Sequence, residues 1–326
     1  MAAPSQAPLL VTGAAGFIGA RFVASCITRG IPFLAVDDPQ HFPNRKEHRE
    51  IAFGSVMDRE ALLPWLEAER PALRGIVHLG ACTDTTQLDE IFLERVNVAY
   101  SKALWRFATQ RRVPLVYASS AATYGDGSQG YDDDEALIGE LRPLNPYGDS
   151  KQRFDRFVLA EEAKGATPPA WSGFKFFNVY GFGERHKGRM ASVVLQAFDQ
   201  IRERGSVQLF RSHRDGIADG HQSRDFVFVG DVVNVLHFAL DRPLARGLYN
   251  LGTGRARTFL DLVQATFAAL GAEPRIEFVD TPADLRERYQ YFTEARMEKL
   301  RAAGFGRPFM SLEDGVREYV RLLLQG

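Results

Sequence analysis

The sequence predicts an α/β fold in which a doubly wound parallel sheet is joined to a smaller, interwoven α/β unit. Short apolar runs alternate with amphipathic stretches through the first half of the chain, and a glycine-rich turn follows the first run. The length of 326 residues suits one large domain or two closely joined ones. Crossovers between parallel strands need helices on both faces. We therefore expect a central sheet covered on both sides.

Short apolar runs bounded by turn residues predict the buried strands. In the first half of the chain they are residues 9–12, 33–36, 75–79 and 114–119. Helical patterns lie between and after them, at residues 17–29, 59–69, 89–110 and 146–163. This repeated strand–helix–strand rhythm is typical of a doubly wound sheet.

The rhythm loosens after a strand predicted at residues 173–179. The elements expected there are a helix at 192–204, a polar loop at 211–223, a strand at 224–229, a helix at 231–240, a strand at 247–251, a helix at 259–270, a strand at 276–278 and two terminal helices. The sequence holds no internal repeat and no low-complexity linker. We therefore expect the second unit to be built from excursions that cover the first.

Charge and cysteine content exclude several classes of protein. The chain holds 40 Lys and Arg against 41 Asp and Glu, a net charge of −1, so bulk charge gives no reason to expect nucleic acid or an anionic membrane as a partner. Cys26 and Cys82 form no CxxC or Cys/His cluster, which predicts neither a disulfide framework nor a metal site. No apolar run approaches the roughly 18 residues that span a bilayer. We expect a cytoplasmic protein.

The glycine-rich turn after the first strand contains Gly13, Gly16 and Gly19. Glycines let such a turn tighten and let its backbone approach a pyrophosphate at the start of a helix. The second strand ends about twenty residues later in Asp37 and Asp38, where a carboxylate can bind ribose hydroxyls. The pattern indicates a dinucleotide site. A glycine turn without a ligand and an ordinary strand-end turn are the alternatives.

Tyr147 and Lys151 lie four residues apart in the helix predicted at 146–163, so their side chains share one face. The Lys151 ammonium can then lower the pKa of the Tyr147 phenol, and a phenolate can act as general base on an alcohol. Ser120 ends the preceding strand and can hydrogen-bond the same oxygen. A solvated helix face and a simple helix cap are the alternatives for these features taken singly. Together they indicate an alcohol-oxidising site.

This combination resembles the extended short-chain dehydrogenases/reductases that act on nucleotide sugars. Within that group, the chain is similar to the ADP-heptose 6-epimerase family along its whole length. The stretches that carry this similarity are residues 79–83, 117–125, 176–181, 184–192, 223–227 and 288–290. Ser120 is followed by Ala121 and Ala122 rather than by an acidic pair, which argues against the dehydratase branch.

The resemblance implies how the chain is divided and what it does. Residues 1–175 would form an NAD(P)-binding Rossmann domain, with residues 205–245 returning to its sheet. Residues 176–204 and 246–326 would form the nucleotide-sugar-binding domain. The family inverts C6″ of an ADP-heptose for the lipopolysaccharide core, through a ketone, with a tightly held NADP that is reduced and reoxidised in each turnover.

The resemblance also implies roles for single residues. The two acid/bases would be Tyr147 and Lys187, Ser120 would polarise the reacting oxygen, and Lys151 would anchor the nicotinamide ribose. Besides Tyr147, Lys151 and Lys187, the cofactor-binding residues would be Gly13, Gly16, Phe17, Ile18, Gly19, Asp37, Asp38, Arg59, Leu79, Ala81, Thr83, Asn97 and Val179. The substrate-binding residues would be Ser120, Asn178, Arg189, Gln196, Phe210, Arg224 and Tyr289. Without the resemblance, Lys187 would be interpreted as a solvated loop lysine and Arg224 as part of a surface ion pair.

Some alternatives stay open. Asp37 and Asp38 would repel the 2′-phosphate of NADP and favour NAD unless Arg45, Lys46 or Arg59 compensates; we expect NADP, with NAD as the alternative. We interpret His186 as structural and Cys82 as packing. Another epimerase or reductase of a UDP-, GDP- or dTDP-sugar is the second functional candidate, and a non-catalytic dinucleotide-binding regulator is the third. We also expect a homo-oligomer, as in the family.

Overall fold

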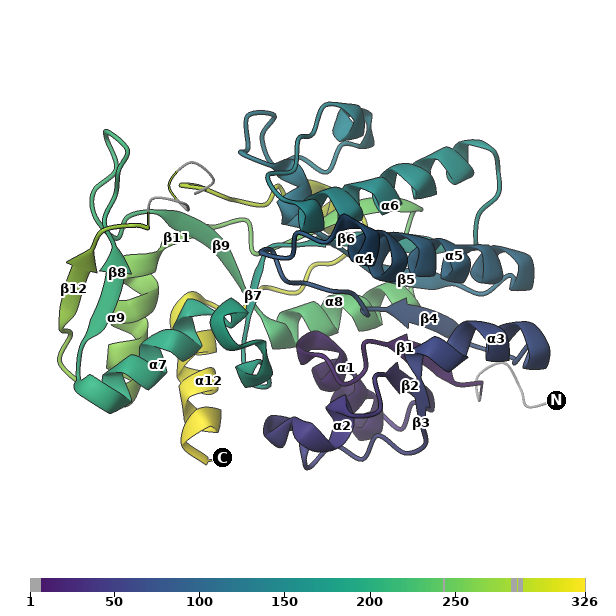
Figure 1. The fold of residues 1–326 in the computed structure, drawn as a ribbon, viewed down its shortest axis with the longest axis horizontal. Coiled ribbons are helices and arrows are strands. Elements are labelled where there is room, and N and C mark those ends of the chain that lie inside the picture. Colours follow the sequence, from purple (N-terminus) through teal and green to yellow (C-terminus); the bar gives the residue numbers. More distant parts are fainter. Residues whose placement is uncertain (1–6, 243, 283–285, 287–289, 326) are drawn as a thin grey trace.

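A seven-stranded parallel sheet forms the centre of the molecule (Figure 1). The computed structural model describes residues 7–242, 244–282, 286 and 290–325. The sheet has the order β10-β6-β5-β4-β1-β2-β3, and every neighbouring pair is parallel. Its strands are β1 (Leu9–Thr12), β2 (Phe33–Asp37), β3 (Val56–Asp58), β4 (Gly75–His78), β5 (Leu115–Ser120), β6 (Trp171–Phe176) and β10 (Gly247–Leu251). The order reverses between β1 and β4, which confirms the predicted doubly wound α/β fold.

Helices cover both faces of this sheet. On one face lie α1 (Phe17–Thr28) and α8 (Val229–Asp241), and on the other lie α3 (Arg59–Glu69), α5 (Tyr100–Arg111) and α6 (Pro146–Ala163). Successive residues of a strand point to opposite faces. Leu9 and Val11 accordingly pack in the core under α1 and α8, while Leu10 packs in the core under the other helices.

Helix boundaries follow local capping chemistry. The Asp58 carboxylate accepts a hydrogen bond from the Glu60 amide and starts α3. The Asn145 side chain accepts one from the Gly148 amide and starts α6, with Pro146 in the first turn. The helix predicted at 89–110 is interrupted. It consists of α4 (Glu90–Leu93), a π-helical turn (Glu94–Ala99) and α5. A short helix, α2 (His41–Asn44), follows β2.

A second unit lies beside the carboxyl ends of the central strands (Figure 1). It contains a three-stranded sheet of β11 (Ala256–Thr258), β9 (Ser223–Phe228) and β7 (Asn178–Tyr180), and a parallel pair of β8 (Val207–Phe210) and β12 (Ile276–Val279). Helices α7 (Val193–Arg204), α9 (Phe259–Leu270) and α12 (Leu312–Gln325) share its apolar core. Helix α11 (Glu298–Ala302) instead contacts β10.

The path of the chain between the two units differs from the prediction. The strand that returns to the central sheet is β10, in the segment expected to bind the sugar, because its backbone pairs with the open edge of β6. Residues 205–245 supply β8 and β9 to the small sheets, and only α8 from this segment packs on the central sheet. The predicted strand at 173–179 is two strands, β6 and β7. The division into two binding domains stays a prediction.

Among the described residues, no helix has the length and apolar character needed to cross a membrane.

Candidate active site

The carboxyl ends of β1, β4 and β5 border a cavity of about 630 Å³. It lies where the strand order reverses, the usual ligand site of open α/β sheets. The predicted site residues that line it are Gly13, Gly16, Phe17, Ile18, Gly19, Asp37, Arg59, Leu79, Ala81, Thr83, Ser120, Tyr147, Lys151, Val179 and Lys187. The fold therefore brings one cofactor-like set and both suggested acid/bases to a single cavity.

Gly13 and Gly19 are the two glycines that this turn requires. Gly13 has a φ of +69°, and a Cβ on it would lie 2.6 Å from the Gly80 nitrogen. A Cβ on Gly19 would lie 2.0 Å from the Gly13 carbonyl oxygen. Helix α1 begins at this turn, and no side chain caps its first amides. Those amides are free to bind the oxygens of an anionic group such as a pyrophosphate.

Asp37 connects the end of β2 to the glycine turn. One carboxylate oxygen accepts a hydrogen bond from the Ala15 amide at 3.0 Å. The other accepts one from the Asp38 amide at 2.8 Å and lies 2.9 Å from His41 Nδ1. Asp38 lies outside the cavity lining and forms a 3.8 Å ion pair with Arg59. The acidic pair thus has one member facing the cavity, and that member is held by three partners.

Basic side chains surround the Asp37 end of the cavity. His41, Arg45 and Arg59 all line it. The Arg45 guanidinium donates a hydrogen bond to the Ala15 carbonyl, and burial lowers its pKa against the opposing charges of Asp37 and Asp38. Sequence reasoning singled out the two arginines and missed His41, although a histidine four residues after the strand-end aspartate was an available signal.

Ser120 and Tyr147 meet between β5 and α6. The Asn145 cap accepts a hydrogen bond from the Gly148 amide at 2.8 Å, which begins α6 beside the end of β5 and places Tyr147 in its first turn. The Ser120 hydroxyl lies close enough to Tyr147 to act on the pKa of its phenol. One helical turn further on, the Lys151 ammonium donates a hydrogen bond to the Ala118 carbonyl at 3.0 Å.

Burial controls the pKa values of this group. Burial raises the pKa of Tyr147, and Ser120 acts in the opposite direction. Burial also lowers the pKa of Lys151 from 10.5 to about 8, against the charge of Asp155. The prediction that the Tyr147 pKa is lowered is therefore wrong for this structure. Desolvation is the larger effect, and the Lys151 ammonium is directed at the Ala118 carbonyl.

Lys187 reaches the cavity from the 3₁₀ segment Arg185–Met190, which follows β7. Its ammonium lies 3.8 Å from the Glu184 carboxylate and 5.4 Å from the centre of the Phe17 ring at the start of α1. Burial lowers the pKa of Lys187, and Glu184 opposes that shift. A second group that can carry a proton therefore enters the cavity from an element far in sequence from Tyr147.

His186 and Glu184 precede this lysine in the chain. The His186 ring lines the cavity and contacts the ring of His48 edge-on at 5.6 Å. Burial and, secondly, Arg45 lower the pKa of His186 to about 3, so the ring is neutral at physiological pH. Glu184 was missed by sequence reasoning, although a carboxylate three residues before the lysine in Glu-Arg-His-Lys was visible.

Asn97 supports the cavity from behind and is not part of its lining. Its side-chain oxygen accepts a hydrogen bond from the Cys82 amide at 2.8 Å, and its amide nitrogen donates to the Cys82 carbonyl and the Ser150 hydroxyl at 2.9 and 3.0 Å. These bonds fix the loop after β4, where Cys82 lines the cavity. Asn97 therefore holds the Cys82 loop against α6 and does not itself face the cavity.

The predicted sugar-side residues other than Ser120 do not line this cavity where they are described. Asn178 is exposed at the start of β7, and Gln196 donates to the carbonyls of Arg189 and Ala191. The Phe210 carbonyl accepts a hydrogen bond from Gln222. Tyr289 lies outside the described residues. The substrate-binding roles of these residues stay predictions.

Arg224, another predicted sugar-side residue, is buried in β9. Its guanidinium donates to the carbonyls of Ser223 and Gln290 and lies 5.5 Å from the centre of the Phe259 ring. The alternative of a surface ion pair does not describe this position. Its substrate contact is likewise a prediction.

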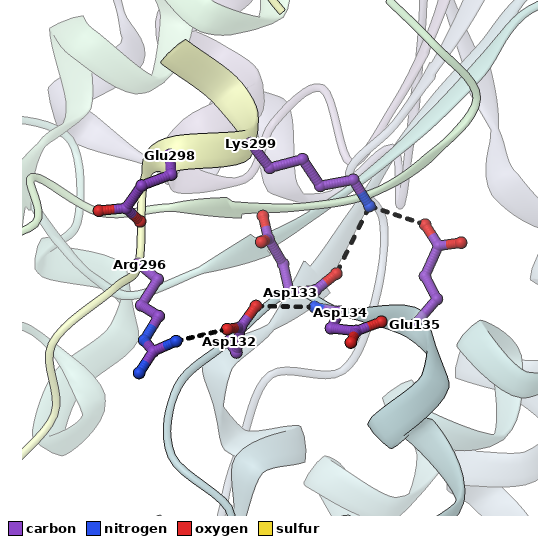
Figure 2. A pocket seen from close by; sticks show the side chains of 7 residues that line it. All are labelled: Asp132, Asp133, Asp134, Glu135, Arg296, Glu298 and Lys299. Atoms are coloured by element: carbon purple, nitrogen blue, oxygen red, sulfur yellow. Dashed lines mark hydrogen bonds and ion pairs between the residues drawn. The ribbon is translucent and has the colours of Figure 1, made fainter. Parts of the chain in front are cut away.

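A separate pocket of about 500 Å³ is lined by charged residues of an acidic loop at residues 132–135 and of the segment at residues 296–299. Figure 2 shows Arg296 paired with Asp132 at 2.7 Å and Lys299 paired with Glu135 at 2.9 Å. These pairs attach the loop to the segment around α11. None of the predicted site residues lines this pocket, and no group of three or more described His, Cys, Asp or Glu side chains is arranged to hold a metal ion.

Comparison with known proteins agrees with this geometry. Residues 9–252 match the model of the NAD dependent epimerase/dehydratase family. The chain is 42% identical over 324 residues to an ADP-L-glycero-D-manno-heptose-6-epimerase of Fusobacterium nucleatum, covering 96% of this chain and 97% of that protein. It is 44% identical over 326 residues to a protein of the same name from Nitratidesulfovibrio vulgaris, covering 97% of each.

A solved structure shares the fold over nearly the whole chain. It is the crystal structure of a Helicobacter pylori ADP-L-glycero-D-manno-heptose-6-epimerase, with a TM-score of 0.78 and 25% sequence identity. The match covers 98% of this chain and 96% of the other.

Proposed function

Since this chain belongs to the NAD dependent epimerase/dehydratase family, we propose that it inverts C6″ of ADP-D-glycero-D-manno-heptose to give the L-glycero epimer. Two relatives that match it over nearly their full length are named for that epimerisation. The product is the form of ADP-heptose that would supply the lipopolysaccharide core. The chain is accordingly an isomerase.

One observation carries this function: Tyr147 and Lys187 enter the same cavity from different elements, together with the glycine turn. Inversion of a carbinol carbon through a ketone removes hydride from one face and returns it to the other. The hydroxyl proton must therefore be handled in two orientations of the sugar. A site with one proton-carrying group would serve both orientations only if the ketone rotated past that group, whereas this cavity offers two groups.

The residues present fit an NAD(P) cofactor. The turn leaves no room for a Cβ at Gly13 or Gly19, the α1 amides are available for the pyrophosphate, and Asp37 and Lys151 would hold the two riboses. A bound NAD(P) would supply the hydride acceptor and donor for C6″.

In the proposed mechanism, the Ser120 hydroxyl hydrogen-bonds the reacting oxygen and fixes it beside Tyr147. One of Tyr147 and Lys187 takes the hydroxyl proton as the carbinol becomes a ketone. After the sugar has turned, the other donates a proton to the ketone oxygen as hydride returns to carbon. The free enzyme recovers its protonation state when the two side chains re-equilibrate with solvent.

The test of this function uses the purified protein with ADP-D-glycero-D-manno-heptose and no added reductant. We expect conversion to the L-glycero epimer, measured by chromatography and proton NMR. A parallel panel of UDP-, GDP- and dTDP-sugars tests the second candidate, another nucleotide-sugar epimerase or reductase. Turnover of a panel sugar alone would replace the proposed substrate. Tight nucleotide retention without turnover of any sugar would point to the non-catalytic regulator.

We propose NADP as the cofactor, because His41, Arg45 and Arg59 line the end of the cavity where a 2′-phosphate would lie. Asp37 is the opposing charge there, and three partners already engage its carboxylate. The mass of the nucleotide released when the purified protein is denatured tests this choice. Release of NAD in place of NADP would reverse it.

We further propose a cytoplasmic homo-oligomer. Leu88 and Ile91 lie near the cavity-lining residue Phe92 in the sequence and expose 70% and 85% of their surface. Burial against a second copy would remove that apolar area from water. Sedimentation velocity measures the assembly state. A single monomer peak at micromolar concentration would contradict it.

A further inference from the structure

Glu184 is a fully buried carboxylate between β7 and α7. Its oxygens accept hydrogen bonds from the Ser192 amide at 2.8 Å, the Ser192 hydroxyl at 2.5 Å and the Gly181 amide at 3.4 Å. A carboxylate with this many donors is fixed in place, and the donors favour its ionised form. The chain therefore fixes a carboxyl group at a defined point behind the cavity wall.

The cationic partner of this carboxylate is the suggested second acid/base. The Lys187 ammonium lies 3.8 Å from Glu184, while its side chain keeps 26% exposure and lines the cavity. Gly188 follows with a φ of +52°, so the chain turns sharply directly after the lysine. The lysine is thus held between a buried anion on one side and the cavity on the other.

We propose that Glu184 is a positioning residue for the reaction, whose buried carboxylate, fixed by Gly181 and Ser192, holds the Lys187 ammonium at the cavity wall. This inference rests on the proposed function, in which Lys187 carries a proton. Glu184 itself lies outside the cavity lining, so it acts through the lysine.

The charges around the pair determine the sign of the expected effect. Burial raises the pKa of Glu184, with Lys187 and the three donors opposing, and burial lowers the pKa of Lys187, with Glu184 opposing. Other titratable groups face the pair from neighbouring elements. They are Tyr319 of α12, His186 beside the lysine, and His41, Arg45 and His48, which act on His186 from the segment after β2.

Glu184 is the acidic group among the causes that act on Lys187. Replacing Glu184 by Gln removes the attractive charge and leaves burial, which lowers the Lys187 pKa. The Lys187 pKa should then fall by about one unit or more.

The first test reads Lys187 without using turnover. Wild-type and Glu184→Gln holoproteins are exposed briefly to an amine-acylating reagent across a range of pH, and the Lys187 peptide is quantified by mass spectrometry. We expect the midpoint of labelling to move about one pH unit lower in the variant. The control is Asp199→Asn, which removes the exposed partner of the neighbouring Arg185. An unchanged midpoint in Glu184→Gln would overturn the proposal.

A reciprocal measurement covers the case in which Glu184→Gln does not fold. Lys187→Met alters a partly exposed side chain and leaves Glu184 in place. In protein labelled with carbon-13 at the Glu carboxyl, we expect the Glu184 titration to move about one unit higher than in wild type. A titration that does not move would overturn the pairing equally well.

Kinetics separate positioning from a merely structural role. We expect Glu184→Gln to lower kcat about tenfold in both directions of the epimerisation and to change KM less than twofold. In the plot of kcat against pH, the limb that reports ionisation of Lys187 should move about one pH unit lower. Glu184→Asp, which keeps the charge, should recover part of kcat. Equal losses in Glu184→Gln and Glu184→Asp, with the pH limb in place, would contradict positioning.

The two failures can be told apart. If wild-type protein turns over no ADP-heptose, the proposed function fails, while the labelling experiment still reports the pair. If the wild-type protein epimerises the sugar and the pH midpoint of Lys187 labelling is the same in Glu184→Gln, only the role proposed for Glu184 fails.

Discussion

At the scale of single residues, the proposed function depends on two groups, Tyr147 and Lys187, whose pKa values are shifted by burial. Burial favours the neutral form of both, since it raises the pKa of Tyr147 and lowers that of Lys187. The cavity therefore holds two groups that can exchange protons, and burial shifts each of them toward its neutral form.

This arrangement predicts unequal but related losses from single substitutions. Tyr147→Phe and Lys187→Met should each lower kcat for epimerisation by about 100-fold or more, because each removes one of the two groups. The double variant should show no epimerisation, while the released nucleotide stays at the wild-type amount.

Two matched controls accompany these variants. Tyr249→Phe removes a phenol hydroxyl that lies outside the cavity lining and donates to the Ala245 carbonyl, and Lys164→Met removes an exposed helix-end lysine. Both should keep wild-type kcat. Near-wild-type turnover in Lys187→Met would remove the two-group assignment.

At the scale of elements, the site depends on how α1 and α6 meet the sheet. Helix α6 is attached through Asp155, whose buried carboxylate accepts hydrogen bonds from Ser119 at 2.6 Å and Tyr117 at 2.9 Å and lies 3.4 Å from the Lys175 ammonium. These contacts join α6 to β5 and β6. The first turn of α6, with Tyr147, is therefore fixed relative to the strand end that carries Ser120.

Removing the cation from this buried pair should destabilise the fold. Lys175→Met leaves Asp155 buried without its charge partner, and we expect the free energy of unfolding to fall by about 3–5 kcal/mol. Chemical denaturation measures it. The double variant Lys175→Met with Asp155→Asn should recover part of the loss, because no uncompensated charge remains. A double variant as unstable as the sum of both single variants would contradict this account.

The contact between α1 and the glycine turn gives a second element-scale prediction. Gly19→Ala would place a Cβ 2.0 Å from the Gly13 carbonyl oxygen, so α1 must move away from β1. We expect less nucleotide to be retained on purification and a lower melting temperature. Gly139→Ala is the matched control, because nothing lies within 4 Å of a Cβ there. Full retention in Gly19→Ala would show that the turn has room to adjust.

Sequence alone predicted the elements that carry their own boundary signals. The helices at 59–69, 146–163 and 259–270 agree with the structure at both ends, because Asp58, Asn145 and the Thr258 capping box fix their starts. The short strands β3, β8 and β11 were missed. Each has three or four residues and is defined by partners that local pattern cannot reveal.

The same limit applies to the site. The residues that follow strands β1, β4 and β5 could be placed together, because parallel strands present their carboxyl ends at one edge. Asn178 and Arg224 could not be placed by such a rule, because they lie on strands of a second sheet. The Tyr147 pKa was predicted in the wrong direction because its burial depends on tertiary packing, which a helical spacing does not report.

At the scale of the whole molecule, four histidines are held in surroundings that keep them neutral. Burial lowers the pKa of His48 and His237 to about 4 and that of His78 and His186 to about 3. In an unfolded chain each would titrate near about 6.5. The unfolded state therefore binds more protons than the folded state below that pH, and the fold loses stability there.

This difference predicts that the free energy of unfolding falls steeply as the pH drops below about 6.5. The contribution of the histidines is fully present above about pH 6.5 and is lost as pH falls toward 4, by up to about 1.4 kcal/mol per pH unit for a fully buried group. Chemical denaturation at pH 7, 6 and 5 measures the slope. His237→Gln should reduce the number of protons taken up on unfolding by about one, and so make the slope shallower. The substitution His221→Gln, at an exposed position, should leave the slope unchanged. Constant stability between pH 7 and 5 would contradict the prediction.

The last strand of the central sheet, β10, has a consequence for how the protein can be made. It pairs with β6 over five residues, yet the chain forms β7, α7, β8, β9 and α8 between these two strands. Until residue 251 leaves the ribosome, β6 has an unpaired edge, which is a template for association with other chains. The nascent chain therefore completes its central sheet only after β7, α7, β8 and β9 of the second unit have been synthesised. A fragment that ends near residue 175 would carry every glycine of the cofactor turn and still present an open, aggregation-prone edge.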